Sequence, residues 1–397
     1  MIWIIELPHL NFLFFTKNVR VLYYIIILLI FQSCATNPTS SVAVDDQKSN
    51  ELNNQALVQQ VKVPRNVIFL IGDGMGLTQI SAGMIRNNNY LNLERCQTVG
   101  LAKTSSSDNL VTDSAAGATA LASGVKTYNG AIGVDPKEKP VPTLLEIASG
   151  NQITTGILAT SSITHATPAC FYAHQPSRKM NEEIAQDLVN SEVDIFIGGG
   201  RDYFVNRKDG RNLINDLKNK SFNIFENITE LDRVENNKIG VFIADFEPVS
   251  FLEGREDFLP RATEKIIRLL NRKNNAFFLM VEGSQIDWKG HSNESEELIS
   301  EMIDFDEAIG IALDFAEKDG ETLVVVTADH ETGGYAITGG DMETGAVEGK
   351  FITGSHTGVM VPVFAYGPGA HIFSGIYENT EIFHKIMEVW NLQNSTP

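Results

Sequence analysis

The chain has 397 residues, of which 43% are apolar, enough to bury the core of one large domain or two ordinary ones. Lysine and arginine number 31 against 50 aspartates and glutamates, which gives a net charge of -19. These values exclude a disordered tail and disfavour binding to a nucleic-acid backbone. They also require that any site for an anionic ligand carry its own local positive charge.

The N-terminal segment has the layout of an export signal. An apolar run over residues 21–31 follows Lys17 and Arg20 and ends shortly before Cys34. The run is too short to span a bilayer comfortably, which favours a cleaved signal over an anchor helix. The expected organisation is a signal, a polar linker and a single folded domain, over residues 1–34, 35–63 and 64–397.

Two outcomes of export are open. Cleavage before Cys34 resembles the processing of bacterial lipoproteins and would leave a lipid on this cysteine as the chain's only link to a membrane. Simple cleavage would leave no lipid. We therefore expect an exported protein that is either periplasmic or anchored to the membrane, facing the periplasm or the cell surface. An earlier apolar stretch over residues 1–15 suggests a later translational start.

Only two cysteines, Cys96 and Cys170, follow Cys34. Two cysteines are too few for a disulfide framework, even in an oxidising compartment. They could pair, but we expect two small residues buried in the core.

Beyond residue 66 the sequence alternates short β-rich runs with helical patterns. Apolar runs of strand length lie at residues 67–71, 155–159, 193–197, 276–281, 322–326 and 361–366. Apolar residues recur at three- and four-residue intervals over residues 181–190, 261–271, 294–317 and 380–389. This alternation is typical of an α/β domain with a doubly wound, mostly parallel central sheet flanked by helices.

Polar residues come directly after three of the predicted strands. Asp73 follows the first strand, Glu282 follows the fourth, and Asp329 and His330 follow the fifth. Ligands of open α/β sheets bind outside the carboxyl ends of the strands. We therefore expect these side chains to converge on one crevice.

A serine at the start of a run of small residues is the first candidate reactive group. Ser114 opens the run Ser-Ala-Ala-Gly-Ala-Thr-Ala. At a helix N-terminus the dipole favours an attacking alkoxide and a phosphate dianion, although an ordinary N-cap serine is the alternative. The glycine-rich turn around Asp73 is a weaker signal. It lacks the spacing of a dinucleotide or P-loop motif, and a lone aspartate there is more often a helix cap.

Histidines and carboxylates recur in three later segments. Asp287 and His291 lie four residues apart, and Asp329 and His330 are adjacent. His356 lies within Gly-Ser-His-Thr-Gly. Imidazole together with carboxylate suits zinc, and this many ligands are enough for two ions. Two close ions can clamp the attacking and leaving oxygens of an in-line displacement, so the joint pattern predicts a two-metal centre.

These segments, in this order, resemble the alkaline phosphatase family, and the resemblance covers essentially everything from Asn66 to the C-terminus. It implies hydrolysis of small phosphate monoesters to an alcohol and inorganic phosphate. Ser114 would be the nucleophile that is transiently phosphorylated. The resemblance also implies an alkaline-phosphatase-like fold for the domain and, because the family often forms dimers, a homodimer.

The resemblance implies two zinc ions that share the work of the displacement. One zinc would activate water and stabilise the leaving oxygen, and the other would activate the serine hydroxyl. The residues that match the family's ligands for the first zinc are Asp287, His291 and His356. Those that match its ligands for the second zinc are Asp73, Asp329 and His330.

The resemblance also implies a third, harder ion, usually magnesium, which prefers oxygen ligands. Its matching residues are Asp73, Thr167 and Glu282. Arg178 matches the family's phosphate-clamping arginine, whose planar fork fits two phosphoryl oxygens at once. Asp113, beside the nucleophile, would orient Arg178.

Two positions depart from some members of the family. His165 stands where some have aspartate, so the third site could hold zinc or bind magnesium more weakly. Trp288 stands where some have lysine, which removes a cation near the phosphate. The segment between His330 and His356 is short and rich in glycine. We therefore expect a small accessory insertion, an open entrance and broad specificity for monoesters.

Two other functions fit parts of the pattern. A phosphodiesterase or sulfatase on a similar sheet is disfavoured, because Arg178 suits a dianionic monoester and Ser114 lacks the Cys/Ser-x-Pro-x-Arg context that sulfatases modify. A noncatalytic surface lipoprotein that only binds phosphate would not need an activated serine between two metals. Replacing Ser114 with alanine separates the classes, since only an enzyme with a phosphoserine intermediate would lose its function.

Overall fold

The computed structural model describes residues 62–235, 238–273 and 275–392. The expected export signal, Cys34 and nearly all of the expected linker lie outside these residues. None of the described helices is both long enough and apolar enough to cross a membrane.

A ten-stranded sheet forms the centre of the described domain, in the order β14-β2-β13-β8-β1-β7-β3-β4-β6-β5. All neighbouring strands run parallel except β13, which is antiparallel to both β2 and β8. The strands are β1 (Asn66–Gly72), β2 (Thr98–Lys103), β3 (Thr154–Ser162), β4 (Ile195–Gly199), β5 (Asn223–Phe225), β6 (Ile239–Phe242), β7 (Phe277–Gly283), β8 (Thr322–Thr327), β13 (Val361–Tyr366) and β14 (Gly375–Glu378). The predicted doubly wound, mostly parallel sheet is confirmed.

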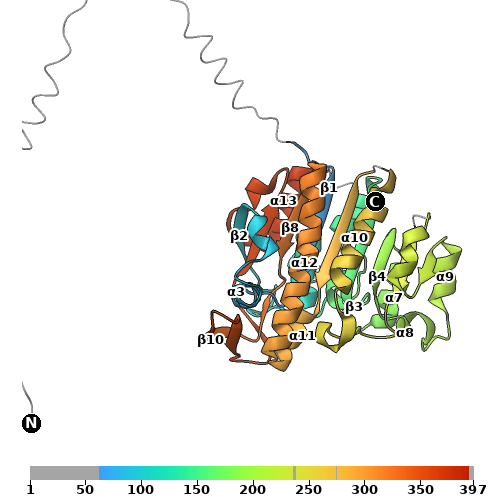
Figure 1. Ribbon diagram of the computed structural model, residues 1–397. Coiled ribbons are helices and arrows are strands. Elements are labelled where there is room, and N and C mark those ends of the chain that lie inside the picture. The colour runs from blue at the N-terminus through green and yellow to red at the C-terminus, as the bar shows by residue number, and fades with distance from the viewer. Residues whose placement is uncertain (1–61, 236–237, 274, 393–397) are drawn as a thin grey trace, which may run out of the picture. The chain divides into compact units, whose positions relative to one another are not determined.

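Helices cover both faces of this sheet. The α-helices of the described residues are α3 (Leu77–Arg86), α4 (Ser114–Ser123), α5 (Leu144–Gly150), α6 (Ala166–Ala169), α7 (Asn181–Asn190), α8 (Asp202–Val205), α9 (Leu213–Asn219), α10 (Phe258–Leu270), α11 (Gln285–Ser292), α12 (Ser295–Asp319) and α13 (Thr380–Trp390). Figure 1 shows α10 and α12 side by side across one face. Successive residues of β7 point to opposite faces, with Phe278 against Trp390 of α13 and Leu279 toward α10.

The central strands are hydrophobic throughout because both of their faces are covered. Every residue of β1, β7 and β8 is buried, as expected for parallel strands between two layers of helices. The six predicted strands and four predicted helices are all present, with boundaries shifted by up to three residues. The short strands β5, β6 and β14, and the partly exposed β2, were not predicted.

The predicted small insertion is a β-hairpin. Strands β10 (Ala336–Asp341) and β11 (Ala346–Lys350) pair with each other and lie outside the main sheet. They are flanked in sequence by β9 (Glu331–Thr332) and β12 (His356–Thr357), which pair antiparallel. Both predicted core cysteines, Cys96 and Cys170, are buried and unpaired.

A buried ion network joins α12 to the turn that precedes α10. Arg255 lies in the short helical turn η3 (Phe251–Arg255), and its Nη2 lies 2.5 Å from Oε2 of Glu301 and 2.9 Å from Oδ2 of Asp304. No more than 4% of any of these three side chains is exposed. The second carboxylate oxygen of Glu301 accepts a hydrogen bond from the Phe251 amide at 2.8 Å. Burial raises the pKa of Asp304 to about 7, despite the adjacent guanidinium.

Candidate active site

Three carboxylates lie side by side at the carboxyl ends of the central strands. Strand β1 pairs with both β7 and β8, so that Ile71 is level with Glu282 on one side and with Thr327 on the other. Asp73 follows β1 directly, and Asp329 follows β8 after one intervening residue. The side chains of Asp73, Glu282 and Asp329 are fully buried. The predicted convergence of these strand ends on one crevice is confirmed.

The glycine-rich turn after β1 allows close packing around Asp73. Gly74 has φ +76°, and a Cβ there would lie 2.7 Å from the Cα of Asp287. Its amide donates to Oδ1 of Asp329 at 3.3 Å. Asp73 does not cap the following helix, because the N-cap of α3 is Gly76. The cap interpretation of Asp73 is therefore wrong.

The candidate nucleophile is the first residue of α4. Asp113 is the N-cap of this helix, and its carboxylate accepts a hydrogen bond from the Ala116 amide at 3.0 Å. Ser114 is therefore not the cap, and its Oγ lies 3.2 Å from Nε2 of His330. The helix packs tightly here, since a Cβ on Gly117 would lie 3.1 Å from the Cβ of Asp329. Small residues in α4 thus bring its positive end against the carboxylates.

The three residues predicted for the first zinc lie together. Nε2 of His291 is 3.0 Å from Nε2 of His356, and both nitrogens are 3.4 Å from Oδ1 of Asp287. Each imidazole also bonds a backbone carbonyl through Nδ1, His291 at Gly354 and His356 at Thr112, both at 2.8 Å. A proton on Nδ1 leaves Nε2 free as a metal ligand.

The three residues predicted for the second zinc form an adjoining group. Nε2 of His330 lies 3.4 Å from Oδ1 of Asp73 and 3.3 Å from Oδ2 of Asp329. The two groups touch, because the rings of His330 and His356 stack with centroids 3.5 Å apart. Asp287, His330 and His356 also have ligand atoms within 4.8 Å of one another. The geometry therefore fits two ions close together.

A third group lies on the other side of Asp73. Asp73, His165 and Glu282 have ligand atoms within 4.8 Å of one another, with Asp73 and Glu282 buried and His165 half-buried. Oγ1 of Thr167, the fourth member, donates to Oδ2 of Asp73 at 3.4 Å. Behind them, Oγ of Ser161 donates to Glu282 at 3.1 Å.

The buried carboxylates of these groups would be stabilised by bound cations. Burial, reinforced by the charges of Asp329 and Asp287, raises the pKa of Asp73 well above its ordinary value. Burial likewise raises the pKa of Glu282 to about 8 and that of Asp329 to about 6. Oxygens without a hydrogen-bond partner among the described residues include Asp73 Oδ1, Glu282 Oε1 and Asp329 Oδ2. Buried oxygens of this kind are costly unless they bind metal, so the donor set fits the expected ions.

Arg178 lies between Asp113 and His165. Its Nη1 donates to Oδ2 of Asp113 at 3.2 Å, and its Nη2 lies 3.2 Å from Nε2 of His165. Burial together with the neighbouring arginine lowers the pKa of His165 to about 3, so its imidazole is neutral. Trp288 packs edge-to-face on the His165 ring, with centroids 5.7 Å apart.

A cleft of about 420 Å³ opens beside these groups. Its lining brings together the candidate nucleophile, the arginine and the first candidate metal group, and comprises Asn109, Val111, Thr112, Asp113, Ser114, Asn129, Arg178, Asp287, His291, Ser355 and His356. An anion of phosphate size can therefore reach a hydroxyl, a guanidinium and the ligand groups at the same time. This is the arrangement that in-line displacement at phosphorus requires.

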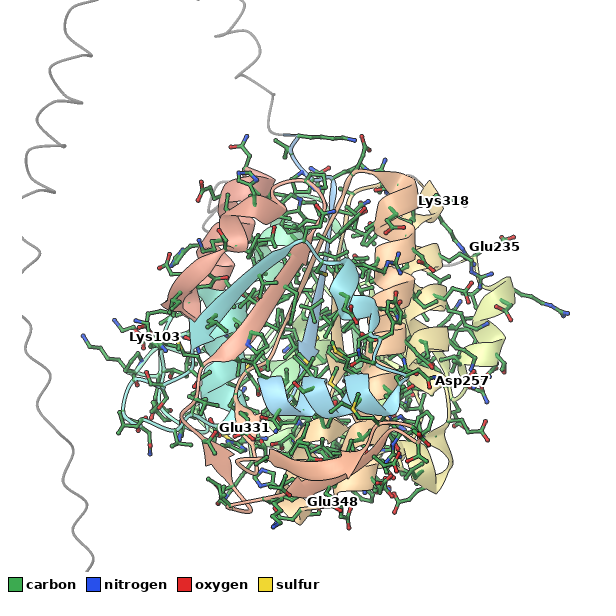
Figure 2. All side chains as sticks on the ribbon, turned by 60° about the vertical axis from the view of Figure 1, so that its left-hand side comes forward. Lys103, Glu235, Asp257, Lys318, Glu331 and Glu348 are labelled. Atoms are coloured by element: carbon green, nitrogen blue, oxygen red, sulfur yellow. The ribbon has the colours of Figure 1, made fainter. Side chains whose placement is uncertain are left out.

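Glu331 joins the two segments that carry His330 and His356, and it was not predicted. Its buried carboxylate accepts hydrogen bonds from Gln79 Nε2 at 2.7 Å, from the Tyr335 amide at 3.1 Å and from the hydroxyl of Thr357. Because Glu331 follows His330 and Thr357 follows His356 in sequence, this contact holds β9 against β12. Figure 2 shows Glu331 toward the same end of the domain as Glu348 of the hairpin, and far from Lys318.

Comparison with known sequences identifies the protein family of the chain. The sequence profile described as alkaline phosphatase matches residues 64–350 and 345–392. The chain belongs to the alkaline phosphatase family. It is 36% identical to alkaline phosphatase 3 of Bacillus subtilis (strain 168), over 82% of the chain and 88% of that protein. It is 31% identical to the alkaline phosphatase of Escherichia coli (strain K12), over 84% and 87% of the two chains.

Solved alkaline phosphatases share the fold. The enzyme from the Antarctic bacterium TAB5 matches with a TM-score of 0.81 at 48% identity, covering 84% of this chain and 100% of that one. A mutant of the TAB5 enzyme, with aspartate in place of a histidine, matches with a TM-score of 0.81 at 47% identity, and is described with Mg bound in the M3 site. Members of this family are hydrolases that act on small phosphate monoesters, and this chain is such a phosphomonoesterase.

Proposed function

We propose that this alkaline phosphatase transfers the phosphoryl group of a monoester to Ser114 and then to water. The observation that carries the proposal is the position of the serine hydroxyl. It lies at the N-terminus of α4, 3.2 Å from Nε2 of His330, in a cleft that it shares with Arg178. A serine in such a place is activated by neighbouring groups and attacks phosphorus in line.

The protein's own residues bind and orient the substrate. Arg178 offers a planar guanidinium to two phosphoryl oxygens, and Asp113 holds its Nη1 from behind at 3.2 Å. Asp113 also caps α4, so one carboxylate fixes both the arginine and the helix that carries the nucleophile. The positive end of α4 favours the negative charge that gathers on Ser114 and on phosphate.

We propose that two zinc ions and one magnesium ion complete the site. When bound, the zinc ions would activate the serine hydroxyl and a water molecule and neutralise the charge on the phosphoryl group. The proposed holders of the first zinc are Asp287, His291 and His356. Those of the second are Asp73, Asp329 and His330. Because the chain must supply deprotonated nucleophiles, turnover should rise toward alkaline pH, and a flat profile at saturating substrate would contradict this.

The third ion is proposed to lie among Asp73, Thr167 and Glu282. Their oxygens suit magnesium. His165 adds an imidazole nitrogen beside Asp73 and Glu282, a donor that favours zinc as a competing occupant. Metal analysis of the protein loaded from a mixture of both ions decides between them.

We also propose that the protein is exported. The support is the apolar run over residues 21–31 ahead of Cys34, both outside the described residues. Lipidation of Cys34 and simple cleavage remain the two outcomes, and the mass of the mature N-terminal peptide separates them. A homodimer is the proposed assembly, which sedimentation of the purified protein tests.

The decisive experiment compares Ser114→Ala with the parent enzyme on a chromogenic phosphate monoester, with the matching diester and sulfate ester alongside. Monoester turnover should fall by at least about 10³-fold, because the residual rate comes from binding and charge stabilisation alone. Ser123→Ala is the matched control, since Ser123 ends the same helix, does not line the cleft, and bonds backbone groups, donating to the Thr119 carbonyl at 2.7 Å and accepting from the Val125 amide at 3.3 Å. Acid quenching with labelled substrate should leave phosphate on Ser114.

Three outcomes would overturn the proposal. Preference for the diester or sulfate ester would assign a related hydrolase. Phosphate binding without turnover would assign a binding protein. Full activity in Ser114→Ala would remove the phosphoserine step.

A further inference from the structure

The turn at residues 128–130, which no prediction singled out, connects the nucleophile segment to the phosphate-binding arginine. It consists of Tyr128, Asn129 and Gly130 and follows α4 in the sequence. We propose that Asn129 is a positioning residue that sets the spacing between Ser114 and Arg178. This inference rests on the proposed function.

The Asn129 side chain bonds the backbone that leads into α4. Its Oδ1 accepts a hydrogen bond from the Asp113 amide at 3.1 Å, and its Nδ2 donates to the Val111 carbonyl at 3.0 Å. The side chain therefore pairs with residues 111–113 as a neighbouring strand would. Fixing this backbone fixes the direction in which α4 begins, and hence where the Ser114 hydroxyl points.

The next residue of the turn reaches the arginine. The Gly130 amide donates to Oδ1 of Asp113 at 3.0 Å, and the Gly130 carbonyl accepts from the Arg178 amide at 2.7 Å. The Tyr128 hydroxyl also donates to the Pro176 carbonyl at 3.1 Å, two residues before Arg178. One turn thus holds the backbone on both sides of the cleft.

The opposite side of the same segment is tied to a metal-ligand candidate. Between Val111 and Asp113, the Thr112 carbonyl bonds Nδ1 of His356 at 2.8 Å. Residues 111–113 are therefore held by hydrogen bonds to Asn129 on one side and to His356 of the proposed first zinc site on the other. Loss of the Asn129 hydrogen bonds would allow Ser114 to shift relative to Arg178, although both residues would still be present.

Asn129 lines the cleft, yet its contacts indicate positioning and not direct contact with substrate. Both ends of its amide are engaged with backbone groups. Its orientation is also set by those partners, because Oδ1 faces an N–H group and Nδ2 faces a carbonyl. Loss of the side chain should therefore lower activity by changing the orientation of Ser114 relative to Arg178.

The test is a double-mutant cycle on the metal-loaded full chain, with Asn129→Ala, Arg178→Ala and both together. Asn129→Ala alone should lower kcat/KM for a phosphate monoester by about 10- to 100-fold, the loss expected from a small misplacement, and weaken binding of inorganic phosphate several-fold. In the Arg178→Ala background, Asn129→Ala should change kcat/KM by less than about threefold, because the spacing no longer matters.

A matched control separates positioning from stability. Asn212 caps α9 with similar bonds, accepting from the Ile214 amide at 3.1 Å and the Asn215 amide at 3.4 Å, and it does not line the cleft. Asn212→Ala should lower the unfolding midpoint by a similar amount and leave kcat/KM unchanged. If Asn129→Ala behaves like Asn212→Ala, the inference fails.

Two further results keep the inference apart from the proposed function. If the two substitutions multiply their effects fully, Asn129 acts independently of Arg178 and the proposed spacing role is wrong. If the parent enzyme lacks monoester turnover, the proposed function fails. The inference is then judged by inorganic phosphate binding, which Asn129→Ala must still weaken. Should Asn129→Ala not fold, Tyr128→Phe removes one bond of the same turn and should weaken phosphate binding about twofold to fivefold.

Discussion

Two groups of buried carboxylates in this domain are neutralised in different ways. Glu301 and Asp304 share the guanidinium of Arg255, within 2.9 Å, so their compensating charge comes from the chain itself. Asp73 and Asp329 lie close together, each with an oxygen that has no hydrogen-bond partner, and no lysine or arginine of the described residues forms an ion pair with either. Buried charge that the chain compensates is structural, whereas buried charge that it leaves uncompensated marks a site for ions from outside.

The largest expected effect comes from changing a carboxylate in the uncompensated group. Asp329→Asn removes a proposed zinc ligand and should reduce monoester turnover by on the order of 10³-fold, the scale of losing a group that stabilises transition-state charge. Bound zinc should fall by one ion per chain. The matched change in the compensated group, Asp304→Asn, should leave turnover intact. Equal turnover in Asp329→Asn and Asp304→Asn would contradict the difference proposed between the two groups of carboxylates.

The second effect is on stability. Arg255→Leu would leave two buried carboxylates without a partner and should lower the free energy of unfolding by about 3–5 kcal/mol, measured in urea. Turnover per folded molecule should not change. The control is Arg261→Leu, which removes an exposed pair with Asp257 and should cost under about 1 kcal/mol. A loss of turnover in folded Arg255→Leu would show that the two groups are coupled.

The smallest effect, counted per pH unit, is on the pH dependence of stability. The pKa of Asp304 is raised to about 7 in the folded protein, against an unfolded value near 3.8. Between these values the folded state holds the extra proton, so stability is lost as pH rises, by at most about 1.4 kcal/mol per pH unit. Asp304→Asn should flatten this part of the profile of urea midpoints, at constant metal concentration. The exposed change Asp314→Asn should not, and an unchanged slope in Asp304→Asn would contradict the assignment.

The central sheet could be predicted from the sequence because its strands are buried on both faces. Their apolar runs are continuous, as in β7 and β8, and their ends are marked by polar residues. Strand β2 alternates between buried and exposed positions and lies near the edge of the sheet, while β5 and β6 have only three and four residues. Such segments owe their pairing to neighbours that the local sequence does not reveal.

The candidate site could be predicted where its side chains are of the types that bind metals, and not where side chains bond the backbone of other segments. Asp329 and His330 stand out as a pair after a strand. Only the family resemblance singles out Arg178, because its local sequence carries no signal of a ligand-binding role. Asn129 and Glu331 bond main-chain groups and hydroxyls of distant segments, so their roles appear only once the chain has folded.

The position of β1 has a consequence for how the protein folds. The Asn66 side chain accepts a hydrogen bond from the Phe277 amide, 211 residues away, and donates to the Thr322 hydroxyl, 256 residues away. Closing loops of this size loses chain entropy before the stabilising contacts between the strands have formed, so formation of the centre of the sheet should be slow. The proposed ligands lie at the ends of these same strands. We therefore expect metal to bind late, after the sheet has formed. Metal binding should then stabilise the folded state without speeding its formation.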